Sequence, residues 1–180
     1  MTDYQSEQLA LRKMQIKYGS MEYTLPDTYK EKNEAYSKAF NTGKGFIVGY
    51  NTFIYRTHGL PGKITIGNNV VIGNHCEIDY SGELIIEDNV VISDGVKIYT
   101  HDHDPYLYTH KAENNVIPGR VVIKNNSWIG SGAIITANVE IGSFSVVGAG
   151  SVVTHSVPDE MIYAGNPAKS IGKNCPKEKK

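Results

Sequence analysis

The chain has 180 residues, of which 40% are hydrophobic and 21% are charged, and its formal net charge at neutral pH is −1. This length fits one domain with short extensions, and the hydrophobic content can supply its core. The near-neutral charge gives no support for nucleic-acid binding. No apolar run approaches the roughly 18 residues of a membrane span. Because the N-terminus lacks a signal-peptide pattern, and Cys76 and Cys175 are expected to be unpaired, the expected location is a reducing cytoplasm.

Residues 1–45 lie outside the repeat that dominates the rest of the chain, and we expect them to form a helical cap. A helix beginning at Pro26 would place Tyr29, Tyr36 and Phe40 on one face. Such a face would cover the open apolar end of a repeat array, since arrays of this kind need terminal caps. A substrate-binding role for one of the two tyrosines is the alternative.

Large aliphatic residues recur at every sixth position between Val121 and Pro158. They are Ile123, Ile129, Ile135, Ile141, Val147 and Val153. A helix would space apolar residues three and four apart, and a lone amphipathic strand would alternate them. The six-residue unit is therefore a short strand plus a turn, and three units make one triangular coil with the aliphatic side chains inside.

The same spacing continues upstream in two shorter blocks. Its members are Ile66, Ile72 and Ile78, then, after two extra residues, Ile86, Ile92 and Ile98, with Val48, Ile54 and Leu60 as a weaker extension. We therefore expect a parallel β-helix of about five coils over residues 46–158. Residues 159–180 would form a C-terminal segment and tail.

Residues 100–120 interrupt the repeat and are expected to form one large loop extruded from the solenoid. About twenty residues without a repeat pattern are unusual inside a solenoid unless they have a function. The loop concentrates ionisable and aromatic side chains, namely His101, Asp102, His103, Asp104, Tyr106, Tyr108 and His110. Because packing does not require histidine at these positions, we expect at least one of them to be functional.

Three motifs, NSWIGSGAII, VVGAGSVVT and YAGNPAKSI, accompany the repeat. Together they resemble the hexapeptide-repeat acyltransferases, and within them the maltose and galactoside O-acetyltransferases and their polysaccharide-modifying relatives. The resemblance covers about Val48 to Ile171. It implies an all-β, left-handed parallel β-helix, with the hand taken from the resemblance because periodicity cannot show it. It also implies a homotrimer with active sites between subunits, acetyl-CoA as co-substrate, a saccharide acceptor and no metal.

The resemblance also assigns roles to individual residues of this chain. The family's catalytic histidine, counted from Ile92 and Val96, corresponds to His103. The residues that correspond to the CoA cleft are Trp128, Ser131, Ala149, Thr154 and Lys169. The residues expected to contact the acceptor are Asn74, His101 and Asp104.

These residue types suit acyl transfer from a thioester to an alcohol. A neutral imidazole at His103 can take the proton of an attacking hydroxyl at cytoplasmic pH. Ser131 can donate a hydrogen bond to the developing oxyanion, and a loop folded over a subunit interface can keep water from the thioester. The group that holds the tautomer of His103 is left open among Asp102, Asp104 and a backbone carbonyl.

Other functions remain as alternatives at this stage. The nearest are an N-acetyltransferase of an amino sugar and a serine acetyltransferase. A zinc enzyme of the γ-carbonic-anhydrase type is suggested by His75, His101 and His103, but that type has histidines near the slots held here by Ser131 and Thr136. A non-catalytic scaffold is disfavoured by the extruded loop.

Overall fold

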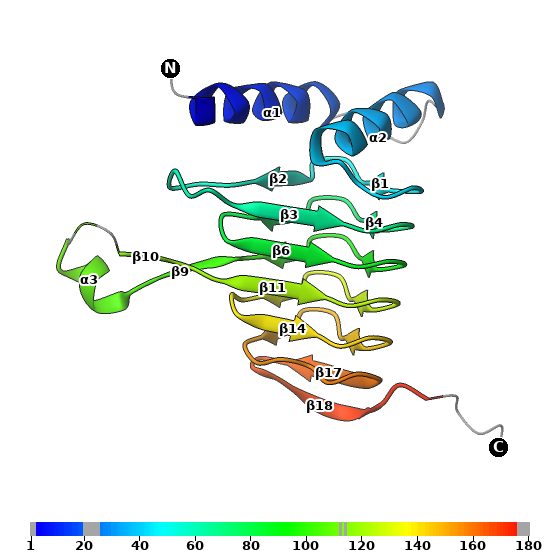
Figure 1. Ribbon diagram of the computed structural model, residues 1–180. Coiled ribbons are helices and arrows are strands. Elements are labelled where there is room, and N and C mark those ends of the chain that lie inside the picture. The colour runs from blue at the N-terminus through cyan, green and yellow to red at the C-terminus, as the bar shows by residue number, and fades with distance from the viewer. Residues whose placement is uncertain (1–2, 20–25, 112, 114, 176–180) are drawn as a thin grey trace.

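The computed structural model describes residues 3–19, 26–111, 113 and 115–175. The chain winds into a parallel β-solenoid of about six turns, with two helices at its N-terminal end and one loop projecting from its middle (Figure 1). The helices are α1 (Asp3–Gly19) and α2 (Pro26–Phe40).

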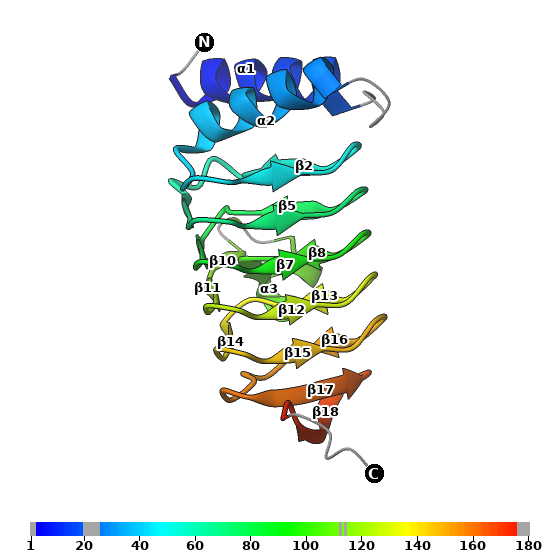
Figure 2. The ribbon, with the colours of Figure 1, turned by 90° about the vertical axis from the view of Figure 1, so that its right-hand side faces the viewer.

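Each full turn of the solenoid contributes one short strand to each of three sheets, whose stacking is visible from the side (Figure 2). Sheet 1 contains β1 (Ile47–Val48), β4 (Val71–Ile72), β7 (Val91–Ile92), β12 (Trp128–Ile129), β15 (Val146–Val147), β17 (Met161–Gly165) and β18 (Ala168–Lys173). Sheet 2 contains β2 (Phe53–Tyr55), β5 (Glu77–Asp79), β8 (Lys97–Ile98), β13 (Ile134–Ile135) and β16 (Val152–Val153). Sheet 3 contains β3 (Lys63–Ile66), β6 (Glu83–Ile86), β11 (Arg120–Ile123) and β14 (Val139–Ile141).

The six-residue spacing sets the strand register. In sheet 2, Ile78 pairs with Ile98, and Ile98 pairs with Ile135, so equivalent aliphatic residues stack from one coil to the next. The three isoleucines are fully buried, as are their equivalents in the other two sheets. Burial of a side chain of this size contributes about 1.5–3 kcal/mol, so the column of repeats is the core of the molecule.

The predicted parallel solenoid with an N-terminal helical segment is confirmed. Two details differ from the expected spacing. Leu60 lies outside the strands, in a turn where its backbone N–H donates to the carbonyl of Thr57 at 3.2 Å. At the other end, β17 pairs in parallel with β15, so sheet 1 continues past residue 158, and β18 then folds back antiparallel on β17.

The two N-terminal helices lie over the first coil (Figures 1 and 2). Tyr36 and Phe40 of α2 are buried, and the Tyr36 hydroxyl donates to the carbonyl of Thr52 at 3.1 Å. Gln15 of α1 is buried as well, and its amide donates to the carbonyl of Ile54 at 2.6 Å. The side chain of Tyr29 lies outside the described residues.

Three insertions interrupt the repeat, and all of them fall at the same corner, between sheet 2 and sheet 3. Consecutive aliphatic positions across this corner are Ile54 and Ile66, then Ile78 and Ile86, then Ile98 and Ile123, where a regular corner such as Ile135 to Ile141 spans six positions. The third insertion carries β9 (His101–His103), the short helix α3 (Pro105–Thr109) and β10 (Val116–Pro118). We call this corner the loop corner. Because successive coils stack directly, the three insertions lie one above another.

No helix in the described part of the chain is long and apolar enough to cross a membrane. Cys76 is buried, Cys175 is exposed, and both are free.

Candidate functional site

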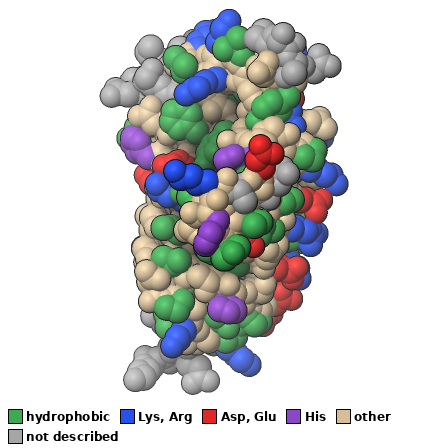
Figure 3. Space-filling view, turned by 90° about the vertical axis from the view of Figure 1, so that its left-hand side faces the viewer, with side chains coloured by type: hydrophobic (Ala, Val, Ile, Leu, Met, Phe, Trp, Pro, Cys, Tyr) green, Lys and Arg blue, Asp and Glu red, His purple; other side chains and the backbone are tan. Residues whose placement is uncertain are grey.

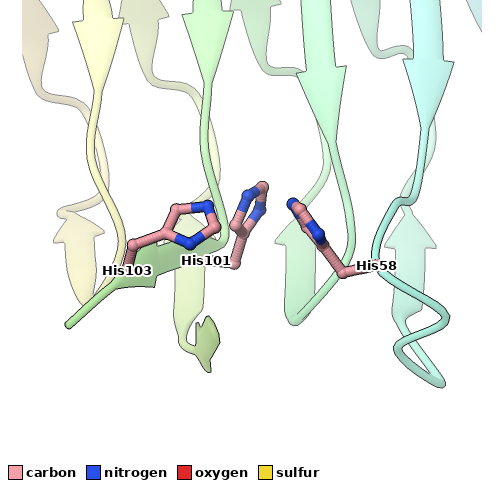
Figure 4. Close-up of side chains that lie close together, drawn as sticks. All are labelled: His58, His101 and His103. Carbon is pink, nitrogen blue, oxygen red and sulfur yellow. The ribbon is translucent and has the colours of Figure 1, made fainter. Parts of the chain in front are cut away.

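The stacked insertions of the loop corner bring three histidines together. His58 comes from the first insertion, and His101 and His103 come from β9 in the third. The ring centroids of His58 and His101 are 5.2 Å apart, those of His58 and His103 are 5.1 Å apart, and those of His101 and His103 are 5.6 Å apart. Figure 4 shows the three rings turned toward one another. We call His58, His101 and His103 the histidine cluster.

The last residue of β5, directly before the second insertion, supplies a buried carboxylate that anchors His101. The Asp79 side chain is fully buried, and its Oδ2 lies 2.9 Å from Nδ1 of His101. Asp79 also accepts hydrogen bonds from Ser81 and from the backbone N–H and hydroxyl of Thr100. Burial raises the pKa of Asp79, but the hydrogen bonds from Ser81, Thr100 and His101 outweigh burial, so the net shift of the pKa is downward. The carboxylate is therefore ionised, and the His101 ring donates to it through Nδ1.

The ring of His103 is held by a different group, the side chain of Asn115. Nδ1 of His103 lies 2.9 Å from Oδ1 of Asn115. Asn115 directly precedes β10, and β10 pairs antiparallel with β9, which carries His103. An amide oxygen can only accept, so Nδ1 carries the hydrogen and Nε2 of the neutral ring carries the lone pair. Neither neighbouring aspartate holds this ring. Asp102 accepts from the backbone N–H of His103 at 2.7 Å, and Asp104 is the N-cap of α3, accepting from the N–H of Leu107 at 2.9 Å.

His58 is the exposed member of the histidine cluster. Its backbone has a φ of 57°, a left-handed conformation in which asparagine and histidine are more common than most residues. Partial burial of the ring lowers the pKa of His58, and the adjacent His101 and His103 lower it further. His75, which the sequence groups with the loop histidines, lies elsewhere, with its ring edge-on to Tyr50 at 4.7 Å between centroids.

A cavity of about 920 Å³ opens beside the histidine cluster, between α1 and sheet 2. Its walls are mostly aromatic and polar, and they include Tyr4, Gln8, Arg12, Tyr55, Glu77, Tyr99 and His101. Burial, followed by the charges of Asp79, Tyr99 and Glu77, raises the pKa of Tyr55 to about 12, so its hydroxyl remains a hydrogen-bond donor at neutral pH. Figure 3 looks onto the face from which the loop projects, where several histidines and hydrophobic side chains are exposed. The size is typical of a small-ligand pocket.

Several residues predicted to line a CoA cleft lie at a different corner, between sheets 1 and 2. We call this corner the glycine corner and define it as residues 73–76, 93–96, 130–133 and 148–151. Ser131 and Ala149 are exposed there in successive coils, and the N–H of Gly150 donates to the carbonyl of Ser131 at 2.8 Å. Gly132 and Gly150 have φ values of 68° and 66°, which only glycine adopts readily. The corner therefore presents an open backbone surface.

Trp128, Thr154 and Lys169 complete the predicted CoA set. Trp128 is 53% exposed in sheet 1, and its indole N–H donates to the hydroxyl of Ser93 at 2.9 Å. Thr154 is exposed just after β16, and its hydroxyl lies 2.9 Å from Nδ1 of His155. Lys169 is exposed on β18, opposite Ala164 of β17. All three side chains are open to a ligand on the outer surface.

Within one chain, sheet 2 separates the glycine corner from the histidine cluster. Asn74 belongs to the glycine corner, and its side chain is engaged there, accepting from the N–H of Tyr50 at 3.0 Å and donating to Asp94 at 3.2 Å. A single chain thus brings His101, His103 and Asp104 together but does not bring Asn74, Trp128, Ser131 or Ala149 to them.

Sequence reasoning did not identify His58, Asp79 or Asn115 as site residues. The spacing of the repeat carries a signal for the first two, because His58 lies in an insertion and Asp79 directly precedes one, both at the same corner as the extruded loop. Asn115 has no such signal, since its role depends on the pairing of β9 with β10.

Comparisons with known proteins agree with this architecture. Residues 120–155 match the family described as bacterial transferase hexapeptide (six repeats). Over 116 residues, 64% of this chain, the sequence is 37% identical to YJL218W of Saccharomyces cerevisiae, which is named as a candidate acetyltransferase. The match spans only 59% of that protein, so the chain covers little more than half the length of this relative.

Two solved structures are similar over nearly the whole chain. A maltose O-acetyltransferase from Clostridium difficile 630 is 31% identical with a TM-score of 0.76, covering 93% of this chain and 86% of that one. A galactoside acetyltransferase in complex with coenzyme A is 25% identical with a TM-score of 0.80, covering 97% of this chain and 86% of that one. The solenoid is accordingly a left-handed parallel β-helix. Because the hexapeptide repeat matches and the identity to the maltose O-acetyltransferase is 31% over most of both chains, the chain belongs to the bacterial hexapeptide transferase family.

Proposed function

We propose that the protein is an acetyl-CoA-dependent O-acetyltransferase that acts on a hydroxyl group of a sugar or saccharide. The observation that carries this proposal is the arrangement of His103, whose tautomer is fixed by Asn115, beside His101 at the edge of a cavity large enough for a saccharide. The similarity to a maltose O-acetyltransferase and to a galactoside acetyltransferase with bound coenzyme A supports the same activity and co-substrate.

His103 is the proposed general base. Its Nε2 takes the proton of the acceptor hydroxyl as the oxygen attacks the carbonyl carbon of the thioester. The tetrahedral intermediate then collapses, the carbon–sulfur bond breaks, and the departing thiolate recovers the proton from the imidazolium. The products are an acetyl ester and free CoA, and no acyl-enzyme or metal ion is needed to balance the reaction.

The cavity beneath α1 is the proposed acceptor site. Aromatic rings such as Tyr55 and Tyr99 suit the apolar faces of a sugar ring, and the side chains of Gln8, Arg12 and Glu77 offer donors and acceptors for its hydroxyls. His101 and Asp104 are the proposed acceptor contacts from the loop, and Asn74 is proposed to act from the glycine corner of a neighbouring chain.

The CoA site is proposed to lie between two chains of a homotrimer. Trp128, Ser131, Ala149, Thr154 and Lys169 would hold the cofactor on one chain, and His103 would approach from the next. This assembly removes the separation that sheet 2 imposes within a single chain. Ser131 would then donate to the oxyanion of the tetrahedral intermediate.

The test is release of CoA thiol from acetyl-CoA by the full chain, with a panel of mono- and oligosaccharides, nucleotide sugars and amines. We expect thiol release that depends on a hydroxylated sugar, and mass spectrometry should show one added acetyl group as a base-labile ester. Transfer only to amines would replace the O-acetyl assignment with N-acetyl transfer. Absence of both CoA binding and thiol release with every acceptor would refute the proposal.

A further inference from the structure

We propose that the histidine cluster, His58, His101 and His103, binds one divalent transition-metal ion of the zinc class, and that the bound ion blocks acetyl transfer. Metal binding stands on the geometry of the cluster alone. The blocking effect rests on the proposed function, because it requires His103 to be the general base.

The spacing of the three rings suits one metal ion. Each histidine offers a ring nitrogen, and these three atoms lie within 4.8 Å of one another. Zinc binds histidine nitrogens at about 2.0–2.1 Å in tetrahedral geometry, which places them about 3.4 Å apart. Closing the cluster therefore needs movements of at most about 1.4 Å, which small rotations of the side-chain torsions supply. The exposed His58, on a turn, is the ring most free to close.

Two of the three rings already have the outer partners that metal-bound histidines require. Asp79 accepts a hydrogen bond from Nδ1 of His101, and Asn115 accepts one from Nδ1 of His103, each at 2.9 Å. In metal sites, a carboxylate or other oxygen at the second ring nitrogen fixes the tautomer and directs the remaining lone pair at the ion. Here Nε2 of both rings is left for the ion, and the buried Asp79 adds a negative charge directly behind one ligand.

The ligand set selects the class of metal. Three neutral imidazoles favour zinc, copper, nickel or cobalt over magnesium and calcium, which prefer oxygen ligands. Three protein ligands leave a fourth position open to water or to an anion. The ion would occupy the same Nε2 lone pair of His103 that must accept the hydroxyl proton, so metal binding and general-base catalysis exclude each other at this atom.

The test uses chelator-treated full-length protein without a polyhistidine tag, titrated with Zn²⁺ by calorimetry in the absence of acetyl-CoA. We expect one ion per chain. His58→Asn removes one ligand and retains a residue that tolerates the left-handed backbone. Loss of an outer partner weakens metal binding about 10- to 100-fold, so loss of a ligand should weaken it by at least about 100-fold. Asn115→Ala removes an outer partner and should therefore weaken Zn²⁺ binding by only about 10- to 100-fold.

His110→Asn is the matched control, since His110 lies in the same loop but outside the histidine cluster, with its ring stacked on Tyr106. It should bind Zn²⁺ like the wild type. Co²⁺ provides a second measurement, because a tetrahedral site gives intense visible absorption that His58→Asn should lose. Circular dichroism and thermal unfolding verify that each variant is folded.

The effect on catalysis is measured separately. Zn²⁺ should inhibit the wild type over the concentration range in which it binds, and a chelator should restore the rate. His58→Asn, with its rate expressed relative to its own metal-free rate, should resist the same Zn²⁺ concentrations. Equal Zn²⁺ affinity in the wild type and His58→Asn, or binding other than one ion per chain, would overturn the site. Full activity of the zinc-saturated wild type would overturn the blocking role. Zinc binding by a chain that neither binds CoA nor releases its thiol with any acceptor would support the site and refute the proposed function.

Discussion

His101 and His103 differ in the group that holds Nδ1. The partner of His103 is a neutral amide, and the partner of His101 is a buried, ionised carboxylate. Both arrangements leave Nε2 as the reactive nitrogen. His101 also lines the proposed acceptor cavity, which suits a residue that orients the acceptor. Its pairing with the Asp79 carboxylate also resembles the carboxylate–imidazole pair that supports a general base in serine proteases. Kinetics of single variants separate the two roles.

We expect His103→Ala to lower kcat by about 10²- to 10⁴-fold, the usual effect of removing a general base, with acetyl-CoA binding retained. His101→Ala should lower the rate only about tenfold, since loss of one supporting hydrogen bond is worth about 0.5–1.5 kcal/mol. Steady-state kinetics of thiol release, with CoA binding measured by calorimetry, give both quantities. The reverse order of effects would identify His101 as the base.

The CoA assignment is tested at two exposed residues, Trp128 and Lys169. Each change to alanine should weaken CoA binding, the first through lost aromatic contact and the second through a lost charge near the nucleotide phosphates. The effect of Lys169→Ala should be larger at low ionic strength, because salt screens an exposed ion pair. Lys173→Ala, an exposed lysine at the end of the same strand, is the control. Unchanged CoA affinity in both test variants would show that CoA binds elsewhere on the protein.

The structural element that builds the site is the loop corner. Insertions into a solenoid are tolerated at its corners, because the core is formed by the strands and is unaffected by what projects between them. In this chain, consecutive insertions occupy three successive coils at one corner. Stacking of the coils thereby brings His58, Asp79 and His101 together from segments more than twenty residues apart in sequence.

Truncating a side chain that faces the core should destabilise the protein more than truncating a side chain that faces outward from the same strand. Ile135 is fully buried in β13, and its neighbour Ile134 points outward and is half-buried. We expect Ile135→Ala to lower the free energy of unfolding by about 2–5 kcal/mol, the range for a large buried aliphatic side chain. Ile134→Ala should have a clearly smaller effect. Urea unfolding followed by circular dichroism measures both, and similar losses would contradict the assigned strand register.

At the scale of the whole molecule, one chain keeps the two halves of the proposed site apart. The histidine cluster and the glycine corner lie on opposite edges of sheet 2, and hydrophobic side chains such as Phe53 on sheet 2 and Trp128 on sheet 1 are exposed at 42% and 53%. A symmetric ring of chains would join the two corners and cover part of this apolar surface.

We therefore expect a homotrimer of three 19.8 kDa chains in sedimentation experiments. If each site is shared, mixing inactive His103→Ala with CoA-defective Trp128→Ala should restore activity after the chains are exchanged. Random mixing in equal amounts makes about a quarter of the sites intact. Activity that stays at the sum of the separate variants would place both residues in one chain, and a fully active monomer would exclude the shared site.

The sequence by itself determined the repeating architecture. The six-residue period of Ile66 to Ile78, Ile86 to Ile98 and Ile123 to Val153 specifies both the strands and their register, because every member must enter the same apolar column. It also located the loop that carries His101 and His103 of the candidate site, since a long interruption in a regular repeat has no packing role. The helix α1 was beyond this reasoning: its apolar spacing is irregular, and Gln15 is buried through a hydrogen bond to Ile54 that no periodicity encodes.

Only the tertiary structure decided the composition of the site. His58 and Asp79 are 22 to 45 residues from the loop histidines in sequence, and Asn115 reaches His103 through an antiparallel pairing inside the loop. The positions of these side chains depend on which corner each insertion occupies and on how coils stack there. Periodicity is a property of the chain's core and specifies nothing about contacts between side chains outside it, and for this reason the histidine cluster becomes visible only in three dimensions.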